Sequence, residues 1–168
     1  MRKQEKIPYE EVFRALNKAR VNYLVCGGAA VVLFGYTRLT VDLDLIVSLE
    51  KENLSKLYDI LKRLGYKLRA PIKKEEFIRK EELKKLAEEK NMKVVSFYHP
   101  KDFIKVIDIG VNLPQIPEIL KKKKQIKVKD FIIPIIEIND LIRMKENLAR
   151  PKDIIDAENL KRIKREIK

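Results

Sequence analysis

The feature that most constrains this chain is a short apolar run that stops at two adjacent glycines. Residues 23–26 (Tyr-Leu-Val-Cys) have the composition of a buried strand, and Gly27 and Gly28 follow directly. Glycine allows a tight turn, so the pair predicts a strand-to-helix turn, with the helix over residues 29–34. Backbone N–H groups left bare at the start of a helix can bind phosphate oxygens.

A second apolar segment, residues 41–47, carries two acidic residues in alternation. Side chains alternate between the faces of a strand, so Asp42 and Asp44 should project one way and Leu43 and Leu45 the other, into the core. Carboxylates at this spacing can converge on one divalent cation or bridge two, and oxygen ligands suit Mg²⁺. The alternative is that both acids lie on the solvated face of an edge strand, although Asp is a poor strand former.

A third carboxylate is expected from the later strand. Asp108 lies between Ile107 and Ile109, where a charge is costly unless it is paired or binds a metal. The alternative is that Asp108 simply ends its strand before Gly110. Asp102, which follows a turn, is a weaker candidate.

The remaining periodicity predicts an α/β (α+β) fold, a small mixed sheet flanked by helices. Further helices are expected at 8–19, 75–90, 140–148 and from 151 onward, with one that Ser48 caps and Gly65 closes; strands are expected at 66–70, 93–98, 103–111 and 131–136. We expect residues 1–168 to form a single domain, with a core at about 8–136 and a C-terminal helical segment at about 139–168.

Charge and composition narrow the classes of function. Lys and Arg number 38 against 25 Asp and Glu, and the net charge of +13 favours polyanions as partners. A thermophile-type surface is an alternative source of part of this charge. Lysines at 121–124, 127 and 129 could track an RNA backbone or be simply solvated, since no aromatic residues lie among them to stack bases.

Other compositional features exclude several classes. One Cys and one His exclude a disulfide framework and a structural zinc site. No apolar run is long enough for a transmembrane helix, and no secretion signal is evident. The expectation is therefore a soluble, cytoplasmic protein that has no membrane partner.

Taken together, these motifs resemble the polymerase-beta-like nucleotidyltransferase superfamily. That signature is a hydrophobic residue, Gly, and Gly or Ser, then Asp-hydrophobic-Asp/Glu-hydrophobic after a gap, then a lone Asp on a later strand. Residues 26–28, 42–45 and Asp108 match it. The stretches 27–44, 141–145 and 150–153 are more narrowly similar to small stand-alone members, which include minimal and antibiotic nucleotidyltransferases and abortive-infection toxins. The resemblance covers about residues 23–160.

The resemblance implies a nucleotidyltransferase fold and an Mg²⁺-dependent transfer of a nucleoside monophosphate from an NTP, such as ATP, to a hydroxyl, with release of pyrophosphate. Gly27 and Gly28 would hold the NTP through their backbone. Asp42, Asp44 and Asp108 would be the catalytic metal ligands.

The resemblance extends, less specifically, to basic residues. Arg38 and Lys145 would be phosphate contacts, or else ordinary solvated side chains, and Arg150 and Asp153 are expected to pair with each other. Many active relatives carry Ser where this chain has Gly28, although several branches use Gly-Gly.

The implied acceptor is tRNA or another RNA, an acidic protein or a small molecule, and a cognate antitoxin is a further candidate partner. One alternative is a catalytically inactive nucleotidyltransferase-like module that binds nucleic acid or a toxin–antitoxin partner. The other is a metal-dependent phosphohydrolase, which the shortage of His ligands disfavours.

Overall fold

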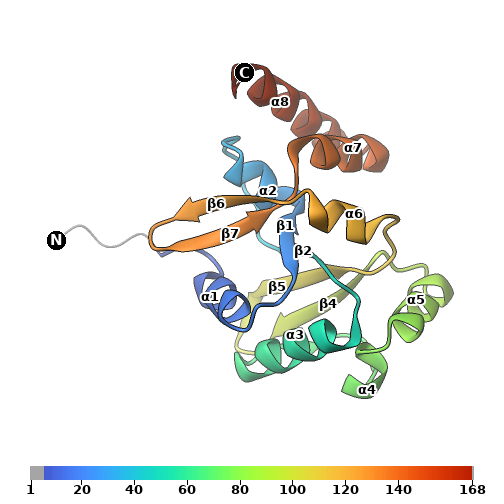
Figure 1. The fold of residues 1–168 in the computed structure, drawn as a ribbon. Helices are drawn as coiled ribbons and strands as arrows, with labels where there is room; N and C mark the ends of the chain where they lie inside the picture. The colour runs from blue at the N-terminus through green and yellow to red at the C-terminus, as the bar shows by residue number, and fades with distance from the viewer. Residues whose placement is uncertain (1–5, 168) are drawn as a thin grey trace.

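The computed structural model describes residues 6–167, in which seven strands form one mixed sheet with helices on both of its faces (Figure 1). The order across the sheet is β3-β4-β5-β2-β1-β7-β6. The strands are β1 (Tyr23–Cys26), β2 (Leu43–Val47), β3 (Lys67–Leu68), β4 (Val94–His99), β5 (Asp102–Gly110), β6 (Lys124–Val128) and β7 (Phe131–Ile135). The predicted α/β architecture is confirmed.

Strand β2 lies inside the sheet, with a partner on each side. It runs antiparallel to β1 and parallel to β5. Leu43 and Leu45 are buried, as the alternation predicted, and so is Val47. Because both edges of β2 are paired, the interpretation of Asp42 and Asp44 as the face of an edge strand is wrong.

The helices occur in the predicted order, except that one helix was not predicted and one predicted helix is divided into two. They are α1 (Glu10–Lys18), α2 (Gly27–Leu33), α3 (Lys51–Arg63), α4 (Lys74–Phe77), α5 (Lys80–Glu89), α6 (Ile116–Lys121), α7 (Ile138–Leu148) and α8 (Pro151–Ile167). Leu54, Leu57 and Leu61 lie on one face of α3 and are fully buried. Helix α6 was not predicted.

The single helix expected at residues 75–90 is two helices, α4 and α5. Phe77 is fully buried between the rings of Tyr58 and Phe97, and Leu83 is fully buried further along. Six residues correspond to about 600° of rotation in a continuous α-helix, which would put Phe77 and Leu83 on different faces. A break between them lets both side chains reach the core.

Two other boundaries differ from the sequence expectation. The N-cap of α3 is Glu50, not Ser48, although the Ser48 hydroxyl accepts a hydrogen bond from the Glu50 N–H at 3.4 Å. The strand predicted at 66–70 has only two residues, since β3 pairs with β4 only at Lys67 and Leu68.

The lysine-rich stretch at 121–129 is largely an edge strand. Strand β6 pairs antiparallel with β7, and Ile126 and Val128 face the protein more than Lys124 and Lys127 do. Lysines on an edge strand discourage pairing with another chain, which gives these residues a structural role independent of RNA.

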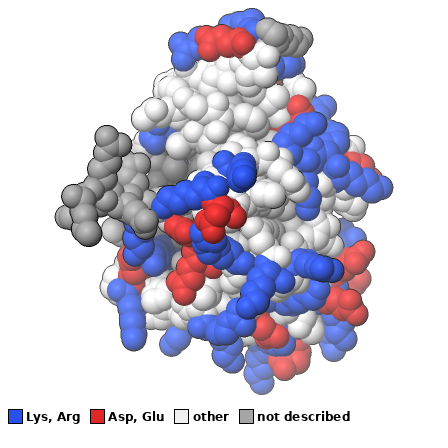
Figure 2. All heavy atoms as spheres, turned by 60° about the vertical axis from the view of Figure 1, so that its left-hand side comes forward, with Lys and Arg blue, Asp and Glu red and all other residues white. Residues whose placement is uncertain are grey.

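The charged side chains are unevenly spread over the surface. On the face shown in Figure 2, Lys and Arg lie mostly over the lower part, interleaved with Asp and Glu, below a broad area with few charges. Within residues 6–167, no helix is both long and apolar enough to cross a membrane.

Candidate active site

A row of four residues crosses the sheet at the centre of the candidate site. Cys26 on β1 is the register partner of Asp44 on β2, Asp44 is that of Asp108 on β5, and Asp108 that of Ser96 on β4. Residues directly opposite one another on adjacent strands project to the same face, with strands about 4.8 Å apart. The sheet therefore holds Asp44 and Asp108 side by side, and Asp42 precedes β2 by one residue.

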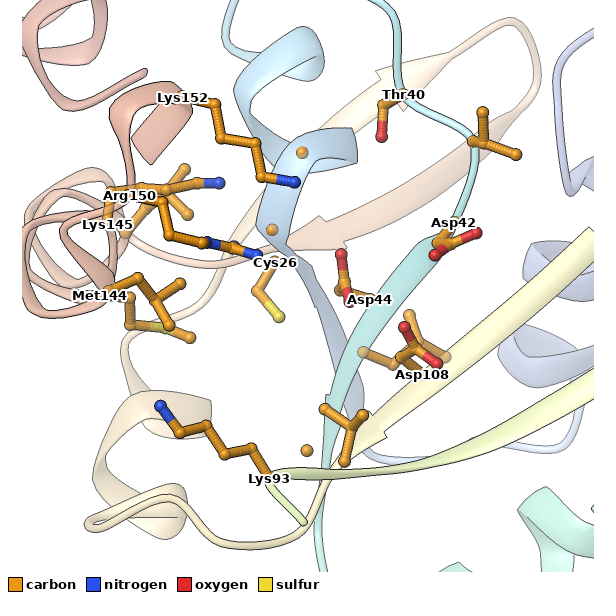
Figure 3. Close-up of a pocket in the computed structure, with 18 of the residues that line it drawn as sticks. Cys26, Thr40, Asp42, Asp44, Lys93, Asp108, Met144, Lys145, Arg150 and Lys152 are labelled. Atoms are coloured by element: carbon orange, nitrogen blue, oxygen red, sulfur yellow. The ribbon is translucent and has the colours of Figure 1, made fainter. Parts of the chain in front are cut away.

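The acids form one wall of a cavity of about 420 Å³. Figure 3 shows Asp42, Asp44 and Asp108 on one side and basic side chains on the other. The cavity is lined by the seven residues to which the sequence analysis gave a metal-binding or nucleotide-binding role, namely Gly27, Gly28, Arg38, Asp42, Asp44, Asp108 and Lys145, whereas the weaker candidate Asp102 does not line it. Their placement is now known, whereas their chemical roles stay predictions.

The two glycines are required by close approach of other groups. Gly27 has a φ of +62°, and a Cβ there would lie 2.2 Å from the Asp44 carboxylate oxygen Oδ2. A Cβ at Gly28 would lie 2.7 Å from the hydroxyl oxygen of Thr40 and 2.8 Å from Nη2 of Arg38. Side chains at these positions would therefore push the acidic wall and the residues 38–40 loop out of place.

Burial and neighbouring negative charges raise the pKa values of two of these carboxylates, Asp44 and Asp42. Burial, followed by the charges of Asp108 and Asp42, raises the pKa of Asp44 to about 7, although Lys145 and Arg150 oppose the shift. Burial and then Asp108 also raise the pKa of Asp42. Negative charge thus accumulates at this wall without full compensation from the protein, and a divalent cation would relieve it.

The donor set suits Mg²⁺ that arrives with phosphate groups. Within residues 6–167, no three Asp, Glu, His or Cys side chains are arranged so that they alone could hold a metal ion. Asp108 is oriented by the Ser96 hydroxyl, which donates to its Oδ1 at 2.6 Å. Mg²⁺ is usually bound by one or two carboxylates together with waters and substrate phosphates, so the acidic wall fits this ion without a closed cage.

The opposite wall is built on two fully buried acids of α8. Lys145 of α7 is itself buried, and its Nζ lies 3.2 Å from Asp153 and 2.9 Å from Asp156. Arg38 reaches Asp156 at 2.9 Å, and Arg150 reaches Asp153 at 2.5 Å. The expected Arg150–Asp153 pair is confirmed, and it belongs to a network that joins α7, α8 and the loop before β2.

This network qualifies the role predicted for Arg38 and Lys145. Both side chains line the cavity, yet both already pair with Asp156, so a phosphate would share them with that carboxylate. Arg150 and the exposed Lys152 also line the cavity, a position that the sequence reasoning did not give them.

Two supporting residues were missed in the sequence. Tyr9 donates its hydroxyl to the carbonyl of Val41 at 2.8 Å and accepts from the N–H of Val106 at 3.2 Å, which fastens the segment before Asp42 to β5. The sequence around Tyr9 contains no motif that would predict this role. Ser96 does carry a signal, because it is the one small polar residue in an apolar strand.

Comparisons with known proteins were made after this geometry was established. No family model matches the chain, and no curated protein matches it by sequence. Among solved structures, it is similar to the lincosamide antibiotic adenylyltransferase LnuA with lincomycin bound, at a TM-score of 0.61 and 20% identity. That match covers 95% of this chain and 99% of LnuA.

Two further structures share the fold. An antigenic nucleotidyltransferase-like protein from Paracoccidioides brasiliensis matches at a TM-score of 0.54 and 15% identity, over 89% of this chain and 71% of that one. ANT(2″)-Ia in complex with adenylyl-2″-tobramycin matches at 0.53 and 13%, over 89% and 83%. The chain therefore has a nucleotidyltransferase-like fold. The matches do not single out the toxin branch.

The raised pKa of Asp44 predicts a pH-dependent stability. Its folded-state pKa of about 7 exceeds the ordinary value of 3.8. The protonated Asp44 therefore contributes its full stability below pH 3.8, and this stability is lost as the pH rises to about 7. The decline is at most about 1.4 kcal/mol per pH unit. Asp44→Asn should therefore raise the melting temperature more at about pH 8 than at about pH 5, and Mg²⁺ should stabilise the parent protein more than the variant. An equal effect of Asp44→Asn at both pH values would contradict the shift.

Gly27→Ala should disturb the acidic wall. The new Cβ is strained by the positive φ and overlaps Asp44, so we expect a loss of at least about 1 kcal/mol in unfolding free energy and a weaker response of stability to Mg²⁺. Gly35→Ala is the control for backbone strain alone: with a φ of +113° it should also lose stability, but its Cβ would meet nothing within 4 Å, so its response to Mg²⁺ should be unchanged. Denaturant unfolding with and without Mg²⁺ measures both effects; a Gly27→Ala protein with an unaltered Mg²⁺ response would refute the overlap argument.

Lys145→Met should be strongly destabilising. It leaves the buried Asp153 and Asp156 short of one cation, and breaking a buried pair costs about 3–5 kcal/mol. Lys161→Met removes exposed ion pairs with Glu146 and Glu158 and should cost far less, because solvent screens exposed pairs. Urea unfolding measures the free energy of unfolding of both variants. Similar losses in the two would show that the buried ion-pair network contributes no more to stability than exposed ion pairs do.

Proposed function

We propose that this chain is a nucleotidyltransferase, residues 1–168 acting as one domain, that moves a nucleoside monophosphate from an NTP to an acceptor hydroxyl. The observation that carries the proposal is the convergence of Asp42, Asp44 and Asp108 on one cavity wall, where burial and then the charges of Asp108 and Asp42 raise the pKa of Asp44. The fold shared with LnuA and ANT(2″)-Ia supports it.

The acidic residues would hold Mg²⁺ and prepare the attack. When bound, the ion supplies positive charge for the entering and leaving oxygens of the transferred phosphate. Asp108, oriented by Ser96, would take the proton of the acceptor hydroxyl. The acceptor oxygen then forms a bond to the α-phosphorus, and the bond to the β-phosphate oxygen breaks, which releases pyrophosphate.

The basic wall would position the triphosphate. Arg150 and Lys152 lie across the cavity from the acids (Figure 3), and Arg38 lies beside the Gly28 backbone. Pre-positioned cations stabilise the charge on phosphate groups without reorganisation during the reaction. The division of the cavity into an acidic and a basic wall is the arrangement that an Mg²⁺–NTP complex requires.

A catalytically inactive binding module is the second candidate. It is favoured by Gly28, which offers no hydroxyl to the terminal phosphates, and by the ion pairs of Arg38 and Lys145 with Asp156. In this case NTPs or a partner, such as an antitoxin, would bind without transfer.

Substitution of the acids separates the two candidates. Asp44→Asn and Asp108→Asn should each lower transfer on the order of 10²-fold or more, while the protein stays folded, because each removes a charge needed in the transition state. Asp102→Asn is the control, since Asp102 starts β5 and does not line the cavity.

The measurement is transfer of label from each labelled NTP, with Mg²⁺, to RNA, to protein extract and to small hydroxyl compounds. Label that appears equally with the parent protein and both variants would refute the roles of the acids. If the parent protein labels none of these acceptors with any NTP, the inactive module is the correct function.

A further inference from the structure

A second, larger cavity adjoins the acidic one. It has a volume of about 1030 Å³ and is lined by residues of α5, α6 and the connection from β2 to α3. Figure 1 shows these three elements on one side of the molecule. Leu113, in the segment between β5 and α6, lines both cavities. A ligand that occupied both cavities would therefore contact Leu113.

Four lysines give this larger cavity, which we call the lysine trench, its charge. They are Lys80 and Lys84 on α5, Lys121 at the end of α6, and Lys123. The trench has only two acidic lining residues, Glu50 and Glu118.

The trench lysines are left without carboxylate partners. Across the part of the chain that the structure describes, none of the four forms an ion pair. Lys80 and Lys84 are one helical turn apart, a spacing at which like charges destabilise a helix. The Nζ of Lys123 donates to Oδ1 of Asn22 at 2.8 Å, and burial lowers the pKa of this lysine. Uncompensated charge of this kind favours an anionic ligand.

We propose that the lysine trench binds the backbone of a nucleic-acid strand whose terminal hydroxyl enters the acidic cavity as the acceptor. This assignment of the acceptor rests on the proposed function, whereas binding of the strand does not. The cations come from α5 and from both ends of the α6–β6 connection, and the cavity is more than twice the size of the acidic one. Such dispersed charge matches a chain of phosphates better than one small anion.

The lining of the trench also predicts which chemical groups of the strand it contacts. No Phe, Tyr or Trp lines it, so bases have no stacking platform and the contacts are with phosphates. Binding should therefore depend strongly on salt and weakly on base sequence. RNA and DNA share this backbone chemistry, and oligonucleotides of both kinds with the same sequence distinguish them.

The test is a binding titration without NTP or Mg²⁺, using labelled RNA and DNA oligonucleotides over a series of salt concentrations. The trench variant carries Lys80→Gln, Lys84→Gln and Lys121→Gln. The control carries Lys18→Gln, Lys56→Gln and Lys62→Gln, which remove the same charge from exposed lysines that line neither cavity. Lys123 is left intact because its bond to Asn22 contributes to the fold.

We expect the trench variant to bind at least about tenfold more weakly than the control, with a salt slope lower by about 2, since each contact to a single strand contributes about 0.7. Its label transfer to oligonucleotides should fall in parallel. The melting temperatures of the two variants should agree.

Three results would overturn the assignment. They are equal binding by trench variant and control, competition by poly-glutamate as effective as by oligonucleotide, and lysine-dependent binding of strands that never receive label while another acceptor does. Failure of nucleotidyl transfer with every acceptor, with lysine-dependent binding preserved, would instead refute the proposed function and leave the trench as a nucleic-acid site.

Discussion

The parallel pairing of β2 with β5 is the constraint on which the candidate site depends. The register places Asp44 opposite Asp108, so the sheet forces together two carboxylates that repel each other. Hydrogen bonds and buried apolar residues on both strands hold this arrangement, since Leu43, Leu45, Ile107 and Ile109 are almost fully buried. The raised pKa of Asp44 is the electrostatic consequence. Stability and site chemistry are thus opposed at one position, which is common where charge is retained for a ligand.

The C-terminal helices α7 and α8 position the basic side chains of the opposite wall through buried ion pairs. Buried Asp153 and Asp156 fix Lys145, Arg38 and Arg150 by ion pairs, so the basic wall is held by acids that do not face the acidic wall. Arg38 belongs to the loop between α2 and β2, and its link to α8 therefore joins the helical segment to the core. The helical segment is part of the cavity rather than an appendage.

The sequence predicted the acidic wall well because alternation in a strand is a local property. Asp42, Asp44 and the Gly27–Gly28 turn could be read from short stretches, and Asp108 stood out as a charge among isoleucines. Contacts between segments that are distant in the sequence could not be predicted from such local patterns. The hydroxyl of Tyr9 meets Val41 and Val106 only through the tertiary fold, and the pairing of Arg38 with Asp156 spans most of the chain. Strand β6 was missed because the alternation of Ile126 and Val128 lies within a lysine-rich stretch, and α6 was missed because it has only six residues.

The two cavities also suggest why one fold can serve different acceptors. The acids and the glycine turn are set by β1, β2 and β5 in the centre of the sheet, where a change of residue disturbs the core. The lysine trench is formed by α5, α6 and the loops beside them, at the periphery. Its four lysines can change without contact to Asp44 or Asp108, since Leu113 is the one residue, among residues 6–167, that lines both cavities. In the proposed function, the residues that select the acceptor are therefore structurally separable from those that carry out the transfer, as expected when function is placed on a scaffold that tolerates loop variation.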